Sequence, residues 1–140
     1  MIIIDSDVLI ELLDRKSEKG DQALKQTIES NEEVATTVIS LHEVLYGLHK
    51  YGKSAQELLS LPILSYTKKD ALLSSKIELE AEKKGKIICR TDAMIAAITI
   101  NNNAKLYTFN LRHFQALQDL GLELYPRICP SKSEQASPTI

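Results

Sequence analysis

Residues 2–13 read IIIDSDVLIELL, and this stretch decides the fold class. Three consecutive isoleucines form a short β-branched run, which is typical of a central parallel strand buried on both faces. Asp5 and Asp7 follow at once, and an apolar pattern with helical spacing resumes at Val8. A strand that passes directly into a helix is the beginning of an α/β unit. The two carboxylates lie at this junction, where they are either turn residues or part of a site.

The same alternation continues along the chain and predicts a three-layer α/β/α sandwich around a central, mainly parallel sheet. We expect one domain over residues 1–126, followed by a disordered polar tail at 127–140. Residues 15–20 are read as a polar connection, and Leu72, Leu73, Ile77 and Leu79 as the inner face of a long helix. The remaining strands are predicted at 33–39, 62–67, 105–109 and 122–125, and the helices at 8–13, 21–30, 40–52, 55–60, 69–84, 92–100 and 112–120.

Composition limits the function classes. The chain of 140 residues is 44% hydrophobic and carries a net charge of −2, which argues against a general electrostatic nucleic-acid binder. An enzyme that acts on nucleic acid through a local groove remains compatible with this charge. Cys89 and Cys129 have no metal-ligand spacing, and we expect Cys89 to pack in the core. The sequence has no signal peptide pattern and no apolar run of transmembrane length, so we expect a cytoplasmic protein with no membrane partner.

Four polar residues stand where an apolar run gives way to a helix. Asp5 follows III, Glu43 follows TTVIS, Asp92 follows IICRT, and Asn110 follows LYTF. Because the carboxyl ends of parallel strands meet at one edge of a sheet, we expect these four side chains to lie close together.

Each of these residues also has a structural explanation. Asp7 is the better candidate for the cap of the first helix, because it immediately precedes the helical pattern. Ser40 and Glu43 have the spacing of a capping box. Asp92 could cap the helix that it begins, and Asn110 could hold a turn.

The joint pattern favours chemistry over capping. Carboxylates gathered at one sheet edge repel one another by about 4 kcal/mol per close pair at an effective dielectric near 20. Capping requires no such gathering, whereas Mg²⁺ or Mn²⁺ prefers carboxylate oxygens and keeps water molecules available for reaction. Spacing alone therefore suggests a metal site without establishing it.

Four segments together resemble, in order and spacing, the PIN-domain ribonucleases, specifically the toxins of VapBC-type toxin–antitoxin pairs. They are IIIDSDVLIELL, SLHEVLYGL, RTDAMIAAI and LYTFNLRHF, and the resemblance extends to about Tyr125. It implies that Asp5, Glu43 and Asp92 are the metal-binding catalytic acids, and that Asp7 supports the first of them. Asn110 takes a fourth catalytic position at which relatives carry Asp or Asn, so the number of metal ions is left open at one or two.

The resemblance also implies an activity and partners. The expected function is that of an Mg²⁺- or Mn²⁺-dependent endoribonuclease, which hydrolyses single-stranded or looped RNA and leaves a 5′-phosphate. Such a toxin is expected to form a homodimer and to be held inactive by a cognate antitoxin protein.

Several flanking residues are secondary candidates. Ser6 and Thr91 lie next to the acids, where they could orient a metal-bound water or cap a helix. Arg112 and Arg90 could contact RNA phosphate, although a solvated cation at a helix end is common. We expect His42 and His49 to be structural or surface residues.

Three other functions compete with the ribonuclease. IIIDSDVL also resembles the opening of haloacid-dehalogenase-like phosphatases, in which the first Asp, here Asp5, is the nucleophile. In such a phosphatase Glu43 would have no role, and Asp92 lacks the second acid that the family carries nearby. A phospho-receiver domain would need a Lys where Asn110 stands. A non-catalytic interaction domain, in which helix caps imitate a site, would bind no divalent cation.

Overall fold

β1 (Ile2–Ile4) lies at the centre of a five-stranded sheet in the computed structural model, which describes residues 1–126. The strand order is β3-β2-β1-β4-β5, and every neighbouring pair is parallel. In register, Ile3 stands opposite Ala35 on one side and Leu106 on the other. The other strands are β2 (Val34–Thr37), β3 (Ile63–Leu64), β4 (Lys105–Tyr107) and β5 (Leu124–Tyr125).

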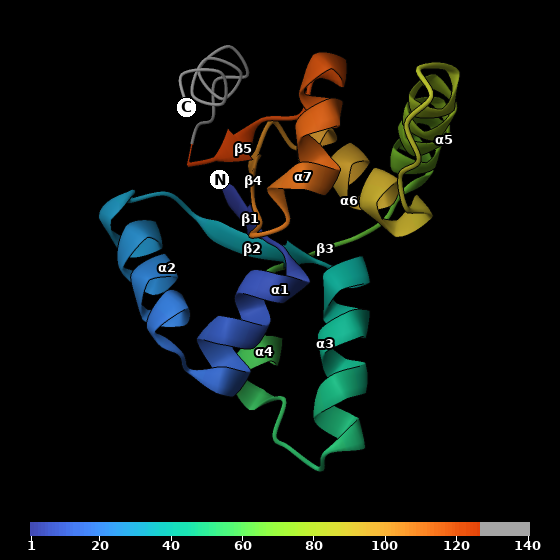
Figure 1. Ribbon diagram of the computed structural model, residues 1–140. Coiled ribbons are helices and arrows are strands. Elements are labelled where there is room, and N and C mark those ends of the chain that lie inside the picture. Colours follow the sequence, from blue (N-terminus) through green and yellow to red (C-terminus); the bar gives the residue numbers. More distant parts are fainter. Residues whose placement is uncertain (127–140) are drawn as a thin grey trace.

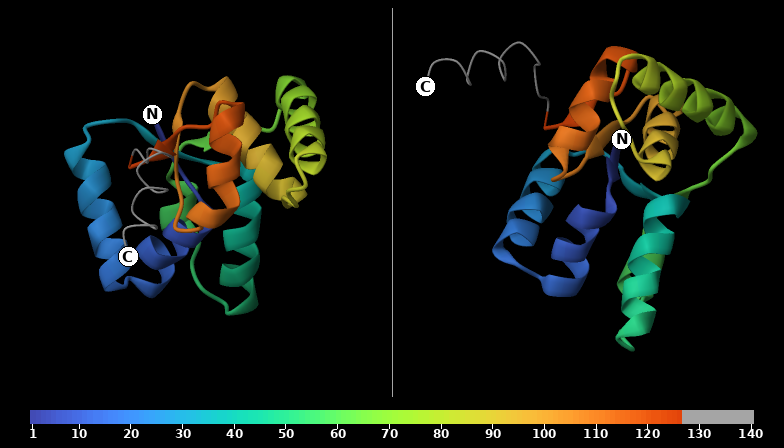
Figure 2. Two further views of the ribbon diagram at one scale, coloured as in Figure 1. Left: turned by 45° about the horizontal axis from the view of Figure 1, so that its top comes forward. Right: turned by 45° about the vertical axis from the view of Figure 1, so that its right-hand side comes forward.

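Helices cover both faces of this sheet (Figures 1 and 2). The predicted α/β/α sandwich is therefore confirmed. One layer contains α1 (Ser6–Leu9), the π-helix η1 (Ile10–Arg15), α2 (Glu18–Glu29), α3 (Val38–Lys50) and α4 (Gln56–Leu59). The other contains α5 (Lys68–Lys83), α6 (Arg90–Asn101), α7 (Leu111–Phe114) and the 3₁₀-helix η2 (Gln115–Leu120).

The three isoleucines of β1 point alternately into two separate cores. Ile3 packs with Ile95, Ile98 and Phe114 in the layer of α5 to α7, whereas Ile2 belongs to the core beneath α1 to α4. Since successive side chains of a strand face opposite sides, an uninterrupted apolar run is required where both faces are covered. All three isoleucines are at most 3% exposed, as this arrangement demands.

Two predicted boundaries are wrong because a hydroxyl residue caps the helix earlier than expected. Thr37 Oγ1 accepts a hydrogen bond from Ser40 N at 3.1 Å, so β2 stops at Thr37 and α3 begins at Val38. Ser17 Oγ accepts from Gly20 N at 3.1 Å, so α2 begins well before the predicted residue 21. The expected polar connection at 15–20 is thus largely helical.

Three burial predictions are also wrong. Leu72 and Leu79 of α5 are 60% and 50% exposed, whereas Ile77 is buried and Leu73 is partly buried as predicted. Cys89 is exposed rather than in the core, because it precedes α6 at the surface. The predicted tail at 127–140 lies outside the described residues. Within residues 1–126, no helix combines the length and the apolar character that a membrane crossing needs.

Candidate active site

Asp5 occupies the junction between β1 and α1 and is the centre of the site. It is only 6% exposed, and it caps α1 by accepting a hydrogen bond from Ser6 N at 2.8 Å. The same oxygen, Oδ1, accepts from Ser40 Oγ at 3.3 Å, while Oδ2 accepts from Thr108 Oγ1 at 2.9 Å. Burial raises the pKa of the Asp5 carboxyl, and these three hydrogen bonds oppose the rise.

Asp7 ties the start of α1 to the loop that follows β4. Its carboxylate accepts hydrogen bonds from Val8 N at 2.7 Å and from Phe109 N at 3.1 Å. Burial raises the pKa of Asp7 from its ordinary 3.8 to about 6, and the charge of Asp5 contributes to the rise. The expectation that Asp7 is the cap of α1 is wrong, because Asp5 takes that position, but its link to Phe109 agrees with a supporting role.

Glu43 and Asp92 lie near Asp5 on two different helices. Partial burial is the largest cause of the raised pKa of each carboxyl, and the charge of Asp5 is the second. The charge of Asp92 raises the pKa of Glu43 further. Glu43 Oε2 also accepts a hydrogen bond from Ser6 Oγ at 3.3 Å. The structure thus brings three of the four predicted catalytic residues, together with Asp7, into one electrostatically coupled cluster.

The capping explanations for two of these acids are wrong. Ser40 and Glu43 do not form a capping box, because Thr37 caps α3 and Glu43 lies in the second turn. Asp92 lies inside the first turn of α6, which begins at Arg90 after Cys89 as its N-cap. Neither Glu43 nor Asp92 therefore has a capping role that accounts for its position.

The side chain of Asn110 reaches the cluster through a histidine in the part of the chain that the structure describes. It precedes α7 without a side-chain capping bond, and its Nδ2 lies 2.9 Å from His113 Nδ1. That same nitrogen of His113 lies 3.5 Å from Asp92 Oδ2. The backbone N–H of Asn110 donates to Thr108 Oγ1 at 3.0 Å, so the loop that carries Asn110 is fixed to the residue that holds Asp5.

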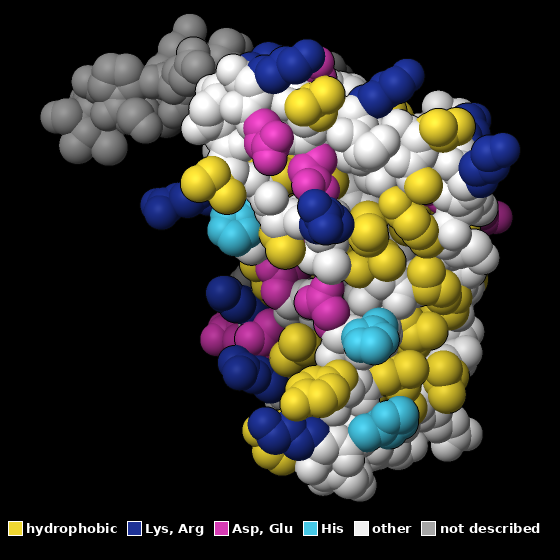
Figure 3. All heavy atoms as spheres, turned by 90° about the vertical axis from the view of Figure 1, so that its right-hand side faces the viewer, with side chains coloured by type: hydrophobic (Ala, Val, Ile, Leu, Met, Phe, Trp, Pro, Cys, Tyr) yellow, Lys and Arg dark blue, Asp and Glu magenta, His cyan; other side chains and the backbone are white. Residues whose placement is uncertain are grey.

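The acid cluster has no strongly basic partner. Among the ion pairs of residues 1–126, none joins a Lys or Arg to Asp5, Asp7, Glu43 or Asp92. The basic side chains beside the cluster are His113, next to Asp92, and His42, whose charge lowers the pKa of Glu43. Figure 3 shows acidic and histidine side chains on the face that carries α3 and α5, next to a broad group of hydrophobic side chains. The carboxylates are held mainly by neutral donors, so their charge is left for a cation.

The secondary candidates have different surroundings. Arg90 forms a two-pronged pair with Glu78, with Nε–Oε1 and Nη2–Oε2 distances of 3.1 and 3.0 Å. Thr91 is exposed and its Oγ1 lies 3.1 Å from Cys89 Sγ. Arg112 is exposed on α7. Of the flanking hydroxyls, Ser6 therefore contacts the cluster and Thr91 does not.

Two site residues were missed by sequence reasoning, namely Ser40 and Thr108. Both are buried hydroxyls that donate to Asp5. Thr108 follows β4 directly, and a hydroxyl residue at the end of a central parallel strand is a signal that could have found it.

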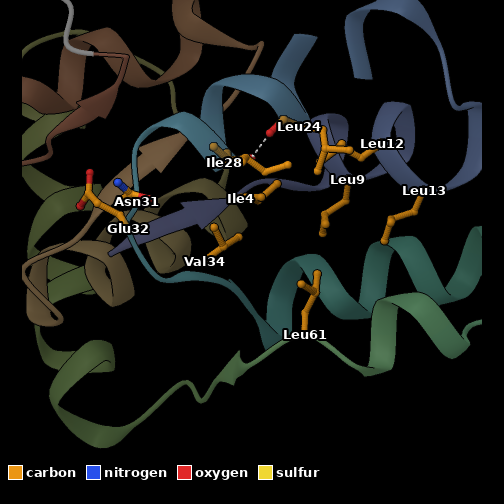
Figure 4. A pocket seen from close by; sticks show the side chains of 11 residues that line it. Ile4, Leu9, Leu12, Leu13, Leu24, Ile28, Asn31, Glu32, Val34 and Leu61 are labelled. Atoms are coloured by element: carbon orange, nitrogen blue, oxygen red, sulfur yellow. Dashed lines mark hydrogen bonds between the residues drawn. The ribbon is translucent and has the colours of Figure 1, made fainter. Parts of the chain in front are cut away.

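A second concave feature lies in the layer of α1 to α4. It is an apolar groove of about 500 Å³ between α1, η1, α2 and the segment around Leu61. Figure 4 shows Leu9, Leu12 and Leu24 pointing into it, with Asn31 and Glu32 at one end. We call it the α1–α2 groove. Since α1 begins at the acids and continues into the groove wall, one helix borders both features.

A five-stranded parallel sheet between helices, with a coupled cluster of carboxylates beside β1, defines an α/β protein with an acidic site, and comparison with known proteins gives the family. The sequence matches the PIN domain over residues 2–120, and the chain therefore belongs to the PIN-domain family. The predicted family resemblance is thereby confirmed, and the phosphatase and receiver alternatives are set aside.

Curated relatives and a solved structure refine the position within the family. The chain is 31% identical over 105 residues to ribonuclease VapC2 of Rickettsia felis, covering 70% of this chain and 78% of that protein. It is 28% identical over 129 residues to ribonuclease VapC1 of Methanocaldococcus jannaschii, covering 90% of this chain and 88% of that protein. A crystal structure of VapBC2 from Rickettsia felis bound to a promoter DNA fragment superposes with a TM-score of 0.73 at 28% identity, covering 89% of this chain and 99% of that one.

Proposed function

We propose that this protein is a metal-dependent endoribonuclease and acts as the toxin of a toxin–antitoxin pair. The observation that carries the proposal is the cluster of Asp5, Asp7, Glu43 and Asp92, in which the charge of Asp5 raises the pKa values of the other three acids and which no Lys or Arg of residues 1–126 pairs with. Its relatives are named ribonucleases, and an RNA substrate implies a cytoplasmic location.

The residues present fit a hydrated divalent cation. Among residues 1–126, no three His, Cys, Asp or Glu side chains converge tightly enough to enclose an ion. Mg²⁺ does not need such a cage, because it keeps several waters and binds directly through one or two carboxylates. The all-oxygen donor set favours Mg²⁺ or Mn²⁺ over softer metals. Asp5, Glu43 and Asp92 would hold the ion, one or two of them directly and the remainder through its bound waters.

The chain's own groups have defined tasks in this reaction. When bound, the ion supplies a more acidic water and stabilises charge on the phosphate. Asp5 is oriented by three neutral donors, and Asp7 fixes the loop after β4 against α1. Hydrolysis adds water across the phosphodiester, leaving a 5′-phosphate and a 3′-hydroxyl, so it requires no protein nucleophile. Arg112, exposed on α7, is free to contact RNA phosphate, whereas Arg90 would first have to leave Glu78.

The catalytic proposal is tested by replacing one acid with the amide of the same shape, which removes its negative charge. Asp92→Asn should abolish Mg²⁺- or Mn²⁺-dependent cleavage of single-stranded RNA, and Asp119→Asn, an equal charge change at an exposed position of η2, should cleave normally. Far-UV circular dichroism checks that both variants are folded. Cleavage by Asp92→Asn at the wild-type rate would falsify the site assignment. Calorimetry with Mn²⁺ provides the second test, since an interaction domain would give no binding heat for the wild type.

The α1–α2 groove supports an antitoxin partner. Its walls are mostly apolar, and a groove of this kind suits an apolar segment of a partner chain. The Rickettsia felis structure is of a VapBC complex, so we assign the groove to an antitoxin. Leu24→Asp, at a half-exposed wall position, should abolish co-purification with the antitoxin from the neighbouring gene while leaving RNA cleavage intact. Undiminished co-purification would refute the assignment.

A homodimer is part of the same proposal. Figure 3 shows hydrophobic side chains gathered on the face that carries α3 and α5, and Tyr46 of α3 and Leu72 of α5 are 65% and 60% exposed. Apolar area of this kind on a small protein is typical of an association surface. Light scattering coupled to size exclusion should give twice the 15.7 kDa chain mass. A mass of one chain at micromolar concentration would refute the dimer.

A further inference from the structure

Ser40 is a fully buried hydroxyl whose contacts lead away from its own helix. It is 0% exposed and lies in the first turn of α3. Serine inside a helix commonly donates to a carbonyl three or four residues earlier, which satisfies the hydroxyl locally. In the described residues, Ser40 Oγ instead donates to Asp5 Oδ1 at 3.3 Å, across a sequence separation of 35.

A second hydroxyl extends that bond into a chain. Thr37 Oγ1 accepts from Ser40 N at 3.1 Å and donates its own proton to Ser40 Oγ at 3.4 Å. Ser40 Oγ in turn donates its proton to Asp5, because a carboxylate can only accept. Hydrogen bonds linked in series polarise one another, so the Thr37–Ser40–Asp5 chain is stronger than a single contact of this length.

The remaining contacts of Asp5 show what this bond adds. Ser6 N is the backbone group next to Asp5 in the chain, and Thr108 holds the other oxygen, Oδ2. Ser40 is the side chain that approaches Oδ1 from α3, the helix that also carries Glu43. It therefore couples the orientation of Asp5 to the helix that presents the second acid.

We infer that Ser40 is a positioning residue, which fixes the Asp5 carboxylate relative to Glu43 for binding of the divalent cation. This inference rests on the proposed metal-dependent function. Partners that orient metal ligands typically change affinity by about 10- to 100-fold when removed. Because the Ser40 bond is long and neutral, we expect a smaller effect, about 3- to 10-fold.

The test measures Mn²⁺ binding to the full chain by the electron paramagnetic resonance signal of free Mn²⁺, well below the unfolding temperature. Ser40→Ala should weaken Mn²⁺ binding about 3- to 10-fold, and Ser40→Cys, which keeps a weak donor of similar shape, should fall between it and the wild type. Ser74→Ala is the matched control. Ser74 is also buried, at 4% exposure, but its hydroxyl contacts Tyr66 Oη and the Ala71 carbonyl far from the acids, so wild-type affinity is expected.

The outcomes separate this inference from the proposed function. If the wild type binds Mn²⁺ and Ser40→Ala binds it equally well, Ser40 has no positioning role and the metal site stands. If Ser74→Ala weakens binding as much as Ser40→Ala, the effect is one of general stability and the inference fails. If the wild type binds no Mn²⁺, the proposed function fails and the inference with it. Should Ser40→Ala not fold, the comparison of Ser40→Cys with the wild type decides in the same way.

Discussion

The acid cluster should make folding less favourable as the pH rises, and Asp7 offers the clearest test. Burial, aided by the charge of Asp5, raises the pKa of Asp7 from 3.8 to about 6 in the folded protein. The folded state therefore holds this proton more tightly than the unfolded state. The resulting stabilisation is fully present below about pH 3.8 and is lost as the pH rises through about 6.

The size of this effect follows from the pKa difference. The gap is 6 − 3.8, about two pH units, which corresponds to about 3 kcal/mol at most. The carboxylate is partly exposed, and screening by solvent reduces this to about 1–2 kcal/mol. Roughly two thirds of the change falls between pH 4.5 and 8, so about 1 kcal/mol should be measurable there.

Urea unfolding in EDTA at pH 4.5 and pH 8 measures this loss directly. The wild type should lose stability over this interval, and Asp7→Asn should lose about 1 kcal/mol less. The absolute stability of the variant is not diagnostic, because Asn has one acceptor oxygen and loses the bond from Phe109 N. Asp119→Asn serves as the control for an equal change of charge. If Asp7→Asn shows the same pH dependence as the wild type, the electrostatic description of the cluster is wrong.

Two further predictions concern the fold. Gly20→Ala should lower the free energy of unfolding by about 2–3 kcal/mol, because a Cβ there would lie 2.2 Å from the backbone oxygen of Glu11. Gly47→Ala is the control and should be neutral or stabilising, because a Cβ at that position meets nothing within 4 Å. Equal melting temperatures for the two variants would contradict the close packing of α2 on η1. Thr67→Ala should cost about 1 kcal/mol in urea unfolding, because Thr67 and Asp70 form the capping box of α5, and an unchanged midpoint would show that this cap does not stabilise the helix.

The layers of the fold could be predicted from periodicity, whereas the helix starts could not. The run Ile2–Ile4 required a strand covered on both faces, and the structure provides both layers. In TTVIS, however, Val and Ile favour a strand by composition, yet they form the first turn of α3. The N-cap at Thr37 overrides that propensity, and a local pattern does not reveal which of several hydroxyls will cap.

Asp5 could be predicted because it directly follows a buried strand of the parallel sheet. Glu43 and Asp92 lie inside α3 and α6 instead of at strand ends, and within the described residues no strand lies between α5 and α6, so the order of the sequence motifs predicted these two acids. Their hydrogen-bond partners could not be predicted, because those contacts join distant parts of the chain. Thr108 donates to Asp5 across 103 residues, and nothing in either local sequence indicates the other. Ser40 likewise is fully buried and donates to Asp5 across 35 residues, a contact that only the packed fold brings about.

The choice of hydroxyls around Asp5 has a physical reason that links stability to function. A Lys or Arg in the place of Ser40 or Thr108 would lower the pKa of Asp5 and stabilise the folded state, but it would also neutralise the charge that the proposed metal ion requires. Hydroxyl donors fix the carboxylate without adding positive charge. The result is a set of acids with raised pKa values, which destabilises the metal-free protein at neutral pH. A bound divalent cation would relieve this repulsion, so the same carboxylates that weaken the free protein favour its metal-bound form.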